Sequence, residues 1–407
     1  MYTPFEIKKD IFYVGVNDRT KYQFENHFLL PKGVAYNSYI LKDEKTVLFD
    51  TVDISYSDVF LHKIKSVLGD KPIDYLVINH MEPDHSGAIE WLVSKFPDIK
   101  IVGNSRTEDM LKGFYGITDN VIVVKDKEEL SIGEKTLRFY LTPMVHWPET
   151  MITYVPELHA IFSGDAFGAF GALNGGILDT QIDPERYHGE MIRYYASVVG
   201  KYGSPVQKAL EKLSEIEIEA ICSTHGPVWV NRKNIENVLA LYDKLSKYEA
   251  DEGLVIAYGS MYGNTEQLAE IIADSAARHG VKDIVMHNVS KSSESHILRD
   301  IFKYKGLIVG SPTYNSKLYP GVESLLSALE NRQMKNRIFG YFSVYAWANG
   351  AKKELKAFSE KMDFELIGEP FDMKQSLNPE AIEKAWELGR LMAERLLSEK
   401  AVYICNL

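Results

Sequence analysis

The second part of the chain alternates between strand-like and helix-like segments, and this alternation strongly constrains its fold. Short apolar runs predict five strands, at residues 254–258, 284–287, 306–310, 337–343 and about 364–368. Helices are predicted between them, with a long last helix from about 379 to 398. Five strands separated by helices are typical of a doubly wound parallel sheet.

The first part of the chain is richer in strands than a regular alternation of strands and helices. Strands are predicted at about residues 11–16, 36–41, 46–52, 73–79, 99–103, 121–125, 135–143, 151–155, 159–163 and 218–222. Helices are predicted at about 57–68, 87–96 and 234–248, and two more within about 185–215. The charged, glycine-closed segment 249–253 predicts a linker. The 407 residues therefore divide into two domains, 1–250 and 252–407, which the usual size of about 150 residues per domain allows.

Charge and cysteine content exclude several classes of protein. The net charge of -11 disfavours nucleic acid, which requires a basic face, and weakly disfavours anionic membranes. The two cysteines, Cys222 and Cys405, are too few for a disulfide scaffold or an iron–sulfur cluster. No apolar run approaches the roughly 20 residues that span a bilayer, and the N-terminus has no signal-peptide core. We therefore expect a soluble, cytoplasmic protein with no membrane partner.

A dense run of ligand-type residues, His80-Met-Glu82-Pro-Asp84-His85, directly follows the apolar segment 73–79. Three more ligand-type residues each lie just after a later predicted strand: His146, Asp165 and His225. Loops at strand ends can turn several side chains onto one point. A lone histidine is usually structural, but surface solvation does not explain so many ligands in one run. Seven ligands with one bridging group suit two metal ions about 3.5–4 Å apart.

The pattern His-x-Glu-x-Asp-His, followed by distant His, Asp and His, resembles that of the metallo-β-lactamase superfamily. Most members have histidine where this chain has Glu82, and they bind zinc for hydrolysis. A carboxylate is a harder ligand than imidazole, and mixed oxygen and nitrogen ligation suits iron that changes oxidation state, which zinc cannot do. Glu82 and the run His146-Trp147-Pro148 resemble the flavodiiron proteins, or A-type flavoproteins. The resemblance implies an N-terminal αββα sandwich.

This resemblance implies two non-haem iron ions and assigns a ligand to each of the seven positions. One iron would be bound by His80, Glu82 and His146, the other by Asp84, His85 and His225, and Asp165 would bridge them. Tyr195 would supply a catalytic phenol near the metals, although plain helix packing also explains this residue. Glu25 lies where some members carry a histidine near the substrate pocket.

A loop between the strand 254–258 and the next helix is suited to a phosphate group. The hydroxyls of Ser260 and Thr265, with Gly263 between them, can wrap an anion at a helix N-terminus. The loop is neither a GxGxxG motif nor a P-loop, and a helix cap alone would also explain Thr265. It resembles the flavodoxin phosphate loop, which implies that FMN is bound by Ser260, Met261, Tyr262, Gly263, Asn264 and Thr265.

Two further loops at the carboxyl ends of predicted strands favour a flavin site, because ligands of open α/β sheets bind there. The first contains Pro312, Thr313, Tyr314 and Asn315, and the second contains Tyr345, Ala346, Trp347, Ala348, Asn349 and Gly350. Tyr314 and Trp347 are candidates to flank the isoalloxazine ring. Flavodiiron proteins are usually richer in glycine around the tryptophan, so we expect the detailed flavin contacts to differ here.

The resemblance covers essentially the whole chain and implies a reductase of O2 to water, or of NO to N2O, with electrons delivered through FMN. Two alternatives stay open. One is a zinc-dependent hydrolase fused to a flavodoxin-like domain, against which Glu82 argues. The other is an electron carrier with a silent metal domain, against which the complete set of seven ligands argues.

The resemblance also implies partners. The electron donor could be rubredoxin, a reduced deazaflavin or another flavoprotein, and the absence of a Cys-x-x-Cys pair predicts no fused rubredoxin domain. The chain would form a head-to-tail homodimer, or a dimer of dimers, in which the FMN of one subunit faces the iron site of the other.

Overall fold

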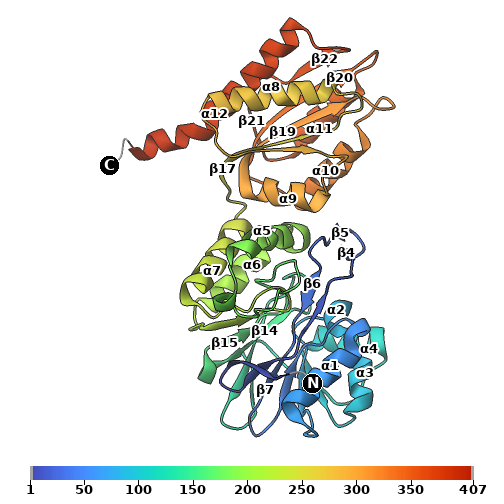
Figure 1. The fold of residues 1–407 in the computed structure, drawn as a ribbon, viewed down its shortest axis with the longest axis vertical. Helices are drawn as coiled ribbons and strands as arrows, with labels where there is room; N and C mark the ends of the chain where they lie inside the picture. The colour runs from blue at the N-terminus through green and yellow to red at the C-terminus, as the bar shows by residue number, and fades with distance from the viewer. Residues whose placement is uncertain (1–2, 405–407) are drawn as a thin grey trace. The chain divides into compact units, whose positions relative to one another are not determined.

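The computed structural model describes residues 3–404, with side chains as far as Ser398, so Cys405 lies outside the described residues. The chain forms two compact units, one ending at Ser246 and the other beginning at Lys247 (Figure 1). The domain limits expected from the sequence, 1–250 and 252–407, stay a prediction. Within the described range, no helix is both long and apolar enough to cross a membrane.

The first unit is built on two sheets. The larger has the order β1 (Phe5–Lys8), β2 (Ile11–Tyr13), β7 (Tyr39–Leu41), β8 (Val47–Phe49), β9 (Tyr75–Val77), β10 (Lys100–Gly103) and β11 (Val121–Val123). The smaller has the order β12 (Glu129–Ser131), β13 (Thr136–Leu141), β14 (Met151–Val155), β15 (Ala160–Phe162) and β16 (Ala220–Cys222). The Phe49 and Phe162 rings stack across the two sheets with centroids 3.6 Å apart, which places the apolar core between them.

Helices cover both outer faces of this pair of sheets. Figure 1 shows one group on one side, namely α1 (Ser57–Leu68), α2 (Pro83–Ser86), α3 (Ile89–Lys95) and α4 (Ser105–Tyr115). The opposite side carries α5 (Glu185–Tyr194), α6 (Gly203–Leu213) and α7 (Arg232–Ser246). The expected αββα sandwich is therefore confirmed. Two short hairpins, β3 (Val16–Asp18) with β6 (Val34–Tyr36) and β4 (Gln23–Phe24) with β5 (Phe28–Leu29), complete the unit.

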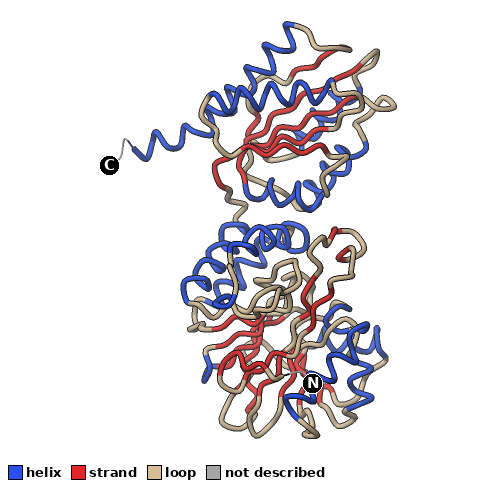
Figure 2. Tube along the Cα trace, in the orientation of Figure 1, coloured by secondary structure: helices blue, strands red, loops and turns tan. Residues whose placement is uncertain are grey.

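The second unit is a parallel sheet between helices, as expected from the alternation (Figure 2). Its order is β18 (Ile284–Asn288), β17 (Asp251–Tyr258), β19 (Tyr304–Pro312), β20 (Ile338–Tyr345) and β21 (Glu365–Leu366), with β22 (Phe371–Lys374) also paired to β20. The helices are α8 (Asn264–Arg278), α9 (Glu294–Lys303), α10 (Pro320–Asn331), α11 (Gly350–Lys361) and α12 (Pro379–Ile404). In chain order the strands read 2-1-3-4-5, the flavodoxin-like form of the doubly wound sheet.

The structure corrects the sequence-based assignment at several places, and it adds the helix α4, which was not predicted. The fifth strand position is divided between β21 and β22, because a glycine and a proline, Gly368 and Pro370, interrupt it. Residues 251–253 begin β17 and are not a free linker: a Cβ on Gly253 would lie 2.2 Å from the Tyr304 ring, so the glycine is needed for packing. The ligand run, expected in a loop, includes the one-turn helix α2, for which Pro83 supplies the favoured first residue.

Arg337 is a buried cation that holds the base of the second unit together. Its guanidinium donates to the carbonyls of Ile301, Phe302 and Tyr248 at 2.8, 3.1 and 2.8 Å. Burial lowers the pKa of Arg337 to about 9. The carbonyl dipoles at the end of α9 and in the segment entering β17 partly offset this cost of burying the charge.

We expect Arg337→Met to destabilise the second unit by about 3 kcal/mol, because it leaves several buried carbonyls without donors. Urea unfolding monitored by circular dichroism would measure this change. The matched control is Arg278→Met, at an exposed arginine paired with Asp274, for which a change within about 0.5 kcal/mol is expected. Equal effects of the two substitutions would contradict the role given to Arg337.

Candidate metal centre and flavin pocket

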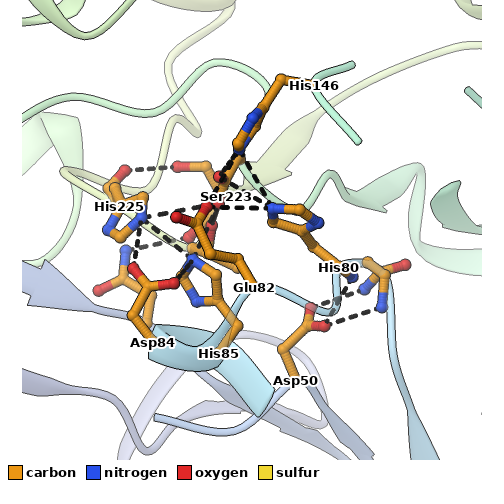
Figure 3. A network of polar contacts seen from close by, with 12 residues as sticks. Asp50, His80, Glu82, Asp84, His85, His146, Ser223 and His225 are labelled. Atoms are coloured by element: carbon orange, nitrogen blue, oxygen red, sulfur yellow. Dashed lines mark hydrogen bonds and ion pairs between the residues drawn. The ribbon is translucent and has the colours of Figure 1, made fainter. Parts of the chain in front are cut away.

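The structure brings all seven predicted ligand residues into one buried cluster at the ends of strands of both sheets. His80 follows β9, and Asp84 and His85 lie on α2. His146, Asp165 and His225 follow β13, β15 and β16. The ligand atoms fall into two groups, each with atoms within 4.8 Å of one another: His80, Glu82, His146 and Asp165, and Asp84, His85 and His225. Figure 3 shows the labelled side chains of the cluster converging: His80, Glu82, Asp84, His85, His146 and His225.

Each group contains a pair of histidines whose Nε2 atoms converge. The Nε2 atoms of His80 and His146 are 3.2 Å apart, and those of His85 and His225 are 3.1 Å apart. The Oε2 atom of Glu82 lies 3.3 and 3.1 Å from the first pair. Ring nitrogens and carboxylate oxygens directed at a common point are the arrangement that a cation binds.

Asp165 connects the two groups through its two carboxylate oxygens. Oδ2 lies 3.2 Å from His146 Nε2 and 3.5 Å from His80 Nε2. Oδ1 lies 2.9 Å from His85 Nε2 and 3.6 Å from His225 Nε2. The Thr224 hydroxyl donates to Oδ1 at 2.6 Å, which fixes the orientation of the carboxylate. The carboxylate is thus placed to bridge two metal ions.

The charges in the cluster compensate one another. Burial raises the pKa of Asp165, but the positive charges of His85 and His80 outweigh this and hold it well below its usual range. Burial lowers the pKa of His85 and His146, but the neighbouring carboxylates outweigh this and raise both to about 9. Ionised carboxylates that draw protons onto adjacent histidines form a site into which cations fit, because metal ions supply the same positive charge.

Residues outside the ligand set hold the backbone of the cluster and the hairpin that covers it. The buried carboxylate of Asp50 accepts from the backbone N–H of Asn79 at 2.8 Å and of His80 at 3.3 Å. On the other side, the ring of Phe24, in the hairpin β4–β5, meets the His225 ring edge-on at 5.5 Å. Arg193, on α5, donates to the Leu29 carbonyl of this hairpin at 2.8 Å. The hairpin is therefore held against the metal cluster.

A tyrosine ring lies beside the cluster, but it belongs to Tyr194, the residue before the predicted Tyr195. The ring of Tyr194 lies 5.3 Å from that of His225, whereas the ring of Tyr195 packs edge-on against Tyr242. Burial, followed by the charges of Asp165 and Glu82, raises the pKa of Tyr194 well above its usual value. Glu25 also lies near Glu82: partial burial, followed by the Glu82 charge, raises the pKa of Glu25 to about 7.

The second unit contains a cavity of about 780 Å³ at the carboxyl ends of its strands. Most of the predicted flavin-binding residues line it: Met261, Tyr262, Asn264, Thr265, Pro312, Thr313, Tyr314, Asn315, Tyr345, Ala346, Trp347 and Ala348. Trp347 is 89% exposed and Tyr314 43% exposed, so aromatic faces stand at its mouth. The volume, the aromatic walls and the N-terminus of α8 fit a flavin mononucleotide.

The remaining predicted residues shape the loops instead of lining the cavity. The Ser260 hydroxyl accepts from the Gly263 N–H at 3.1 Å, and Gly263 has a φ of 94°. Asn349 Oδ1 accepts from the Lys352 N–H at 3.2 Å and caps α11. A Cβ on Gly350 would lie 1.9 Å from the Ser316 carbonyl oxygen, so only glycine allows these two loops to approach.

Four residues that line the cavity were not predicted: Ser316, Val344, Gln375 and Ser376. Gln375 and Ser376 follow β22, the strand missed in the sequence. Gln375 has a φ of 64°, and its N–H donates to the Tyr345 carbonyl at 2.7 Å, which joins this loop to the tryptophan loop. The positive φ of Gln375, a non-glycine residue, can point to a functional site, but it cannot be read from the sequence.

Comparisons with known proteins agree with this geometry. Residues 34–226 match the family model described as ODP family beta lactamase, and residues 256–389 match Flavodoxin. The nitric oxide reductase of Moorella thermoacetica is 32% identical over 97% of this chain and 100% of its own length. The anaerobic nitric oxide reductase flavorubredoxin of Escherichia coli is 30% identical over 96% of this chain and 82% of its own length.

Solved structures give the same result for the fold. The rubredoxin oxygen:oxidoreductase of Desulfovibrio gigas superposes with a TM-score of 0.93 at 30% identity, covering 98% of this chain and 100% of that one. The flavodiiron protein of Giardia intestinalis also gives 0.93, at 27% identity and with 98% of each chain covered. The chain belongs to the flavodiiron protein family. As a member, it is an oxidoreductase that carries FMN and a diiron centre.

We expect Gln375→Ala to weaken FMN binding about tenfold, because the side chain lines the cavity and its amide would supply the flavin with one hydrogen bond of about 1.4 kcal/mol. Fluorescence titration of the full-length apoprotein with FMN would measure it. The matched control is Gln333→Ala, at an exposed glutamine outside the cavity with a φ of 50°, so that both substitutions place alanine in the same backbone region. Unchanged FMN affinity in Gln375→Ala would remove this residue from the flavin site.

Proposed function

We propose that this flavodiiron protein reduces O2 or NO, and that the seven clustered residues hold its two iron ions. His80, Glu82 and His146 would bind one iron, and Asp84, His85 and His225 the other, with Asp165 as the bridge. The observation that carries this proposal is the placement of the two Asp165 oxygens, each against a different pair of histidines. Such a centre, supplied with electrons through FMN, provides the redox chemistry for reducing O2 to water or NO to N2O.

The protein side chains around the centre would position and shield it. The ligands are buried and held by strand ends, so their geometry changes little when the metals change charge. Phe24 and the hairpin β4–β5 would limit the access of water from one side. Glu82 and Glu25 would give that side of the pocket a polar lining.

For the phenol we propose Tyr194 in place of Tyr195. The Tyr194 hydroxyl is buried close to the charges of Asp165 and Glu82, and burial together with these charges raises its pKa and keeps it protonated. It could therefore donate a hydrogen bond to a small molecule bound at the centre. Tyr195 directs its ring to Tyr242 and would support the helix.

The proposal predicts that Asp165→Asn loses most of its iron and its O2 and NO consumption while it retains FMN. Removing the bridging charge weakens both metal positions, whereas the flavin pocket lies in the other unit. Iron and zinc analysis after anaerobic purification, with gas uptake by the reduced protein, would test this. Two zinc ions and no iron in the unaltered protein would instead support the hydrolase alternative.

The control for this test is Asp179→Asn. Asp179 is also a buried carboxylate of the first unit, but it accepts from Asn231 and Asn234 and lies outside the metal cluster. We expect it to keep its iron. Stopped-flow oxidation of the reduced protein by each gas would then rank O2 against NO.

Tyr194→Phe is expected to lower the rate of gas reduction at least tenfold, because a positioned proton donor typically contributes about 100-fold or more. Tyr195→Phe is the matched variant at the next residue, where the π-helical segment begins. It should change the rate less than about twofold, the usual effect of a neutral substitution. Single-turnover kinetics of the two iron-loaded variants would compare them. A larger loss in Tyr195→Phe would return the role to Tyr195.

We further propose, from the family resemblance, that a rubredoxin, a reduced deazaflavin or another flavoprotein donates electrons. We also propose a head-to-tail homodimer, or a dimer of dimers, and a cytoplasmic location. Light scattering of the purified protein would test the assembly. Reduction of the bound flavin by each donor would test the electron source.

A further inference from the structure

The far side of His80 is bound to a carboxylate. His80 Nδ1 lies 2.8 Å from Oε1 of Glu149, and both side chains are 0% exposed. The same oxygen accepts from the backbone N–H of Met81 at 2.9 Å. Since Nδ1–H donates to Glu149, Nε2 is left as the ligand atom that faces the metal group.

The histidines of the other group have no such partner. His225 Nδ1 donates to the neutral carbonyl of Ala35 at 2.7 Å. His85 Nδ1 is buried and has no hydrogen-bond partner in the described part of the chain. The two halves of the cluster therefore differ in their hydrogen bonds: the Nδ1 atom of His80 is bonded to a carboxylate, and the Nδ1 atoms of His225 and His85 are not.

Glu149 is held in place from outside the cluster. The side chain of Asn104 donates to the Glu149 carbonyl at 2.5 Å, and Asn104 is also the N-cap of α4. The second carboxylate oxygen, Oε2, is buried without a partner among the described residues. Burying a carboxylate with an oxygen that has no partner costs folding free energy. The contact of the other oxygen with His80 indicates what the buried carboxylate is for.

We propose that Glu149 is a positioning residue that makes the two iron positions unequal. A carboxylate behind a ligating histidine fixes the ring and makes it a stronger electron donor. The iron held by His80, Glu82 and His146 is then bound more tightly. It also takes up an electron, passing from ferric to ferrous, at a lower potential than its partner. The proposal rests on the ligand assignment of the proposed function.

The test is Glu149→Gln, which keeps the size of the side chain and an oxygen that can accept from His80, but removes the charge. We expect the affinity of the apoprotein for ferrous iron at one of two sites to fall about 10- to 100-fold. In a potentiometric titration followed by electron paramagnetic resonance, the lower of the two iron potentials should move up. The range in which one iron is reduced and the other oxidised should then narrow.

Two further variants make the result decisive. Asp179→Asn should leave both the affinity and the potentials unchanged. Glu149→Asp keeps the charge, and should stay closer than Glu149→Gln to the unaltered potentials even if it packs less well. Unaltered iron affinity and potentials in Glu149→Gln would overturn the inference, whereas failure of the unaltered protein to bind iron would overturn the ligand assignment on which it rests.

Discussion

The shared carboxylate of Asp165 is the contact on which both halves of the metal centre depend. It follows β15, which pairs in parallel with β16, and β16 delivers His225 from the adjacent position. The larger sheet delivers His80 after β9. Because a buried carboxylate is stable only when it is paired, Asp165 needs histidines from both groups. The sandwich brings these strand ends together around one charge.

Much of this centre could be read from local sequence because the ligands lie in the segments that directly follow strands. The cluster contains all the predicted ligands, both those of the run from His80 to His85 and the separate residues His146, Asp165 and His225. The second unit was equally accessible, since β17, β19 and β20 are apolar runs bounded by helices. In both units, a pattern of strand followed by polar loop located the candidate site, and the family resemblance supplied the iron and the flavin.

The features that could not be predicted depend on which way a side chain faces on a helix, or on contacts between residues that are far apart in the sequence. Tyr194 and Tyr195 are adjacent, and a five-residue π-helical segment, Tyr195–Val199, begins between them, so periodicity cannot tell which one faces the metals. Glu149 follows the third histidine by only a few residues, but its value comes from a contact with His80, far away in the chain. Gln375 reaches the flavin pocket through β22, whose four residues are too few to give a strand signal.

The divided fifth strand has a consequence for the behaviour of the protein in a crowded solution. An exposed sheet edge offers unpaired N–H and C=O groups to any other extended chain. Here that edge consists of two residues in β21 and four in β22, with Pro370 between them. At this edge, no segment longer than four residues is available for a second chain to pair with. The interruption that places Gln375 at the flavin pocket therefore also protects this edge of the sheet against edge-to-edge aggregation.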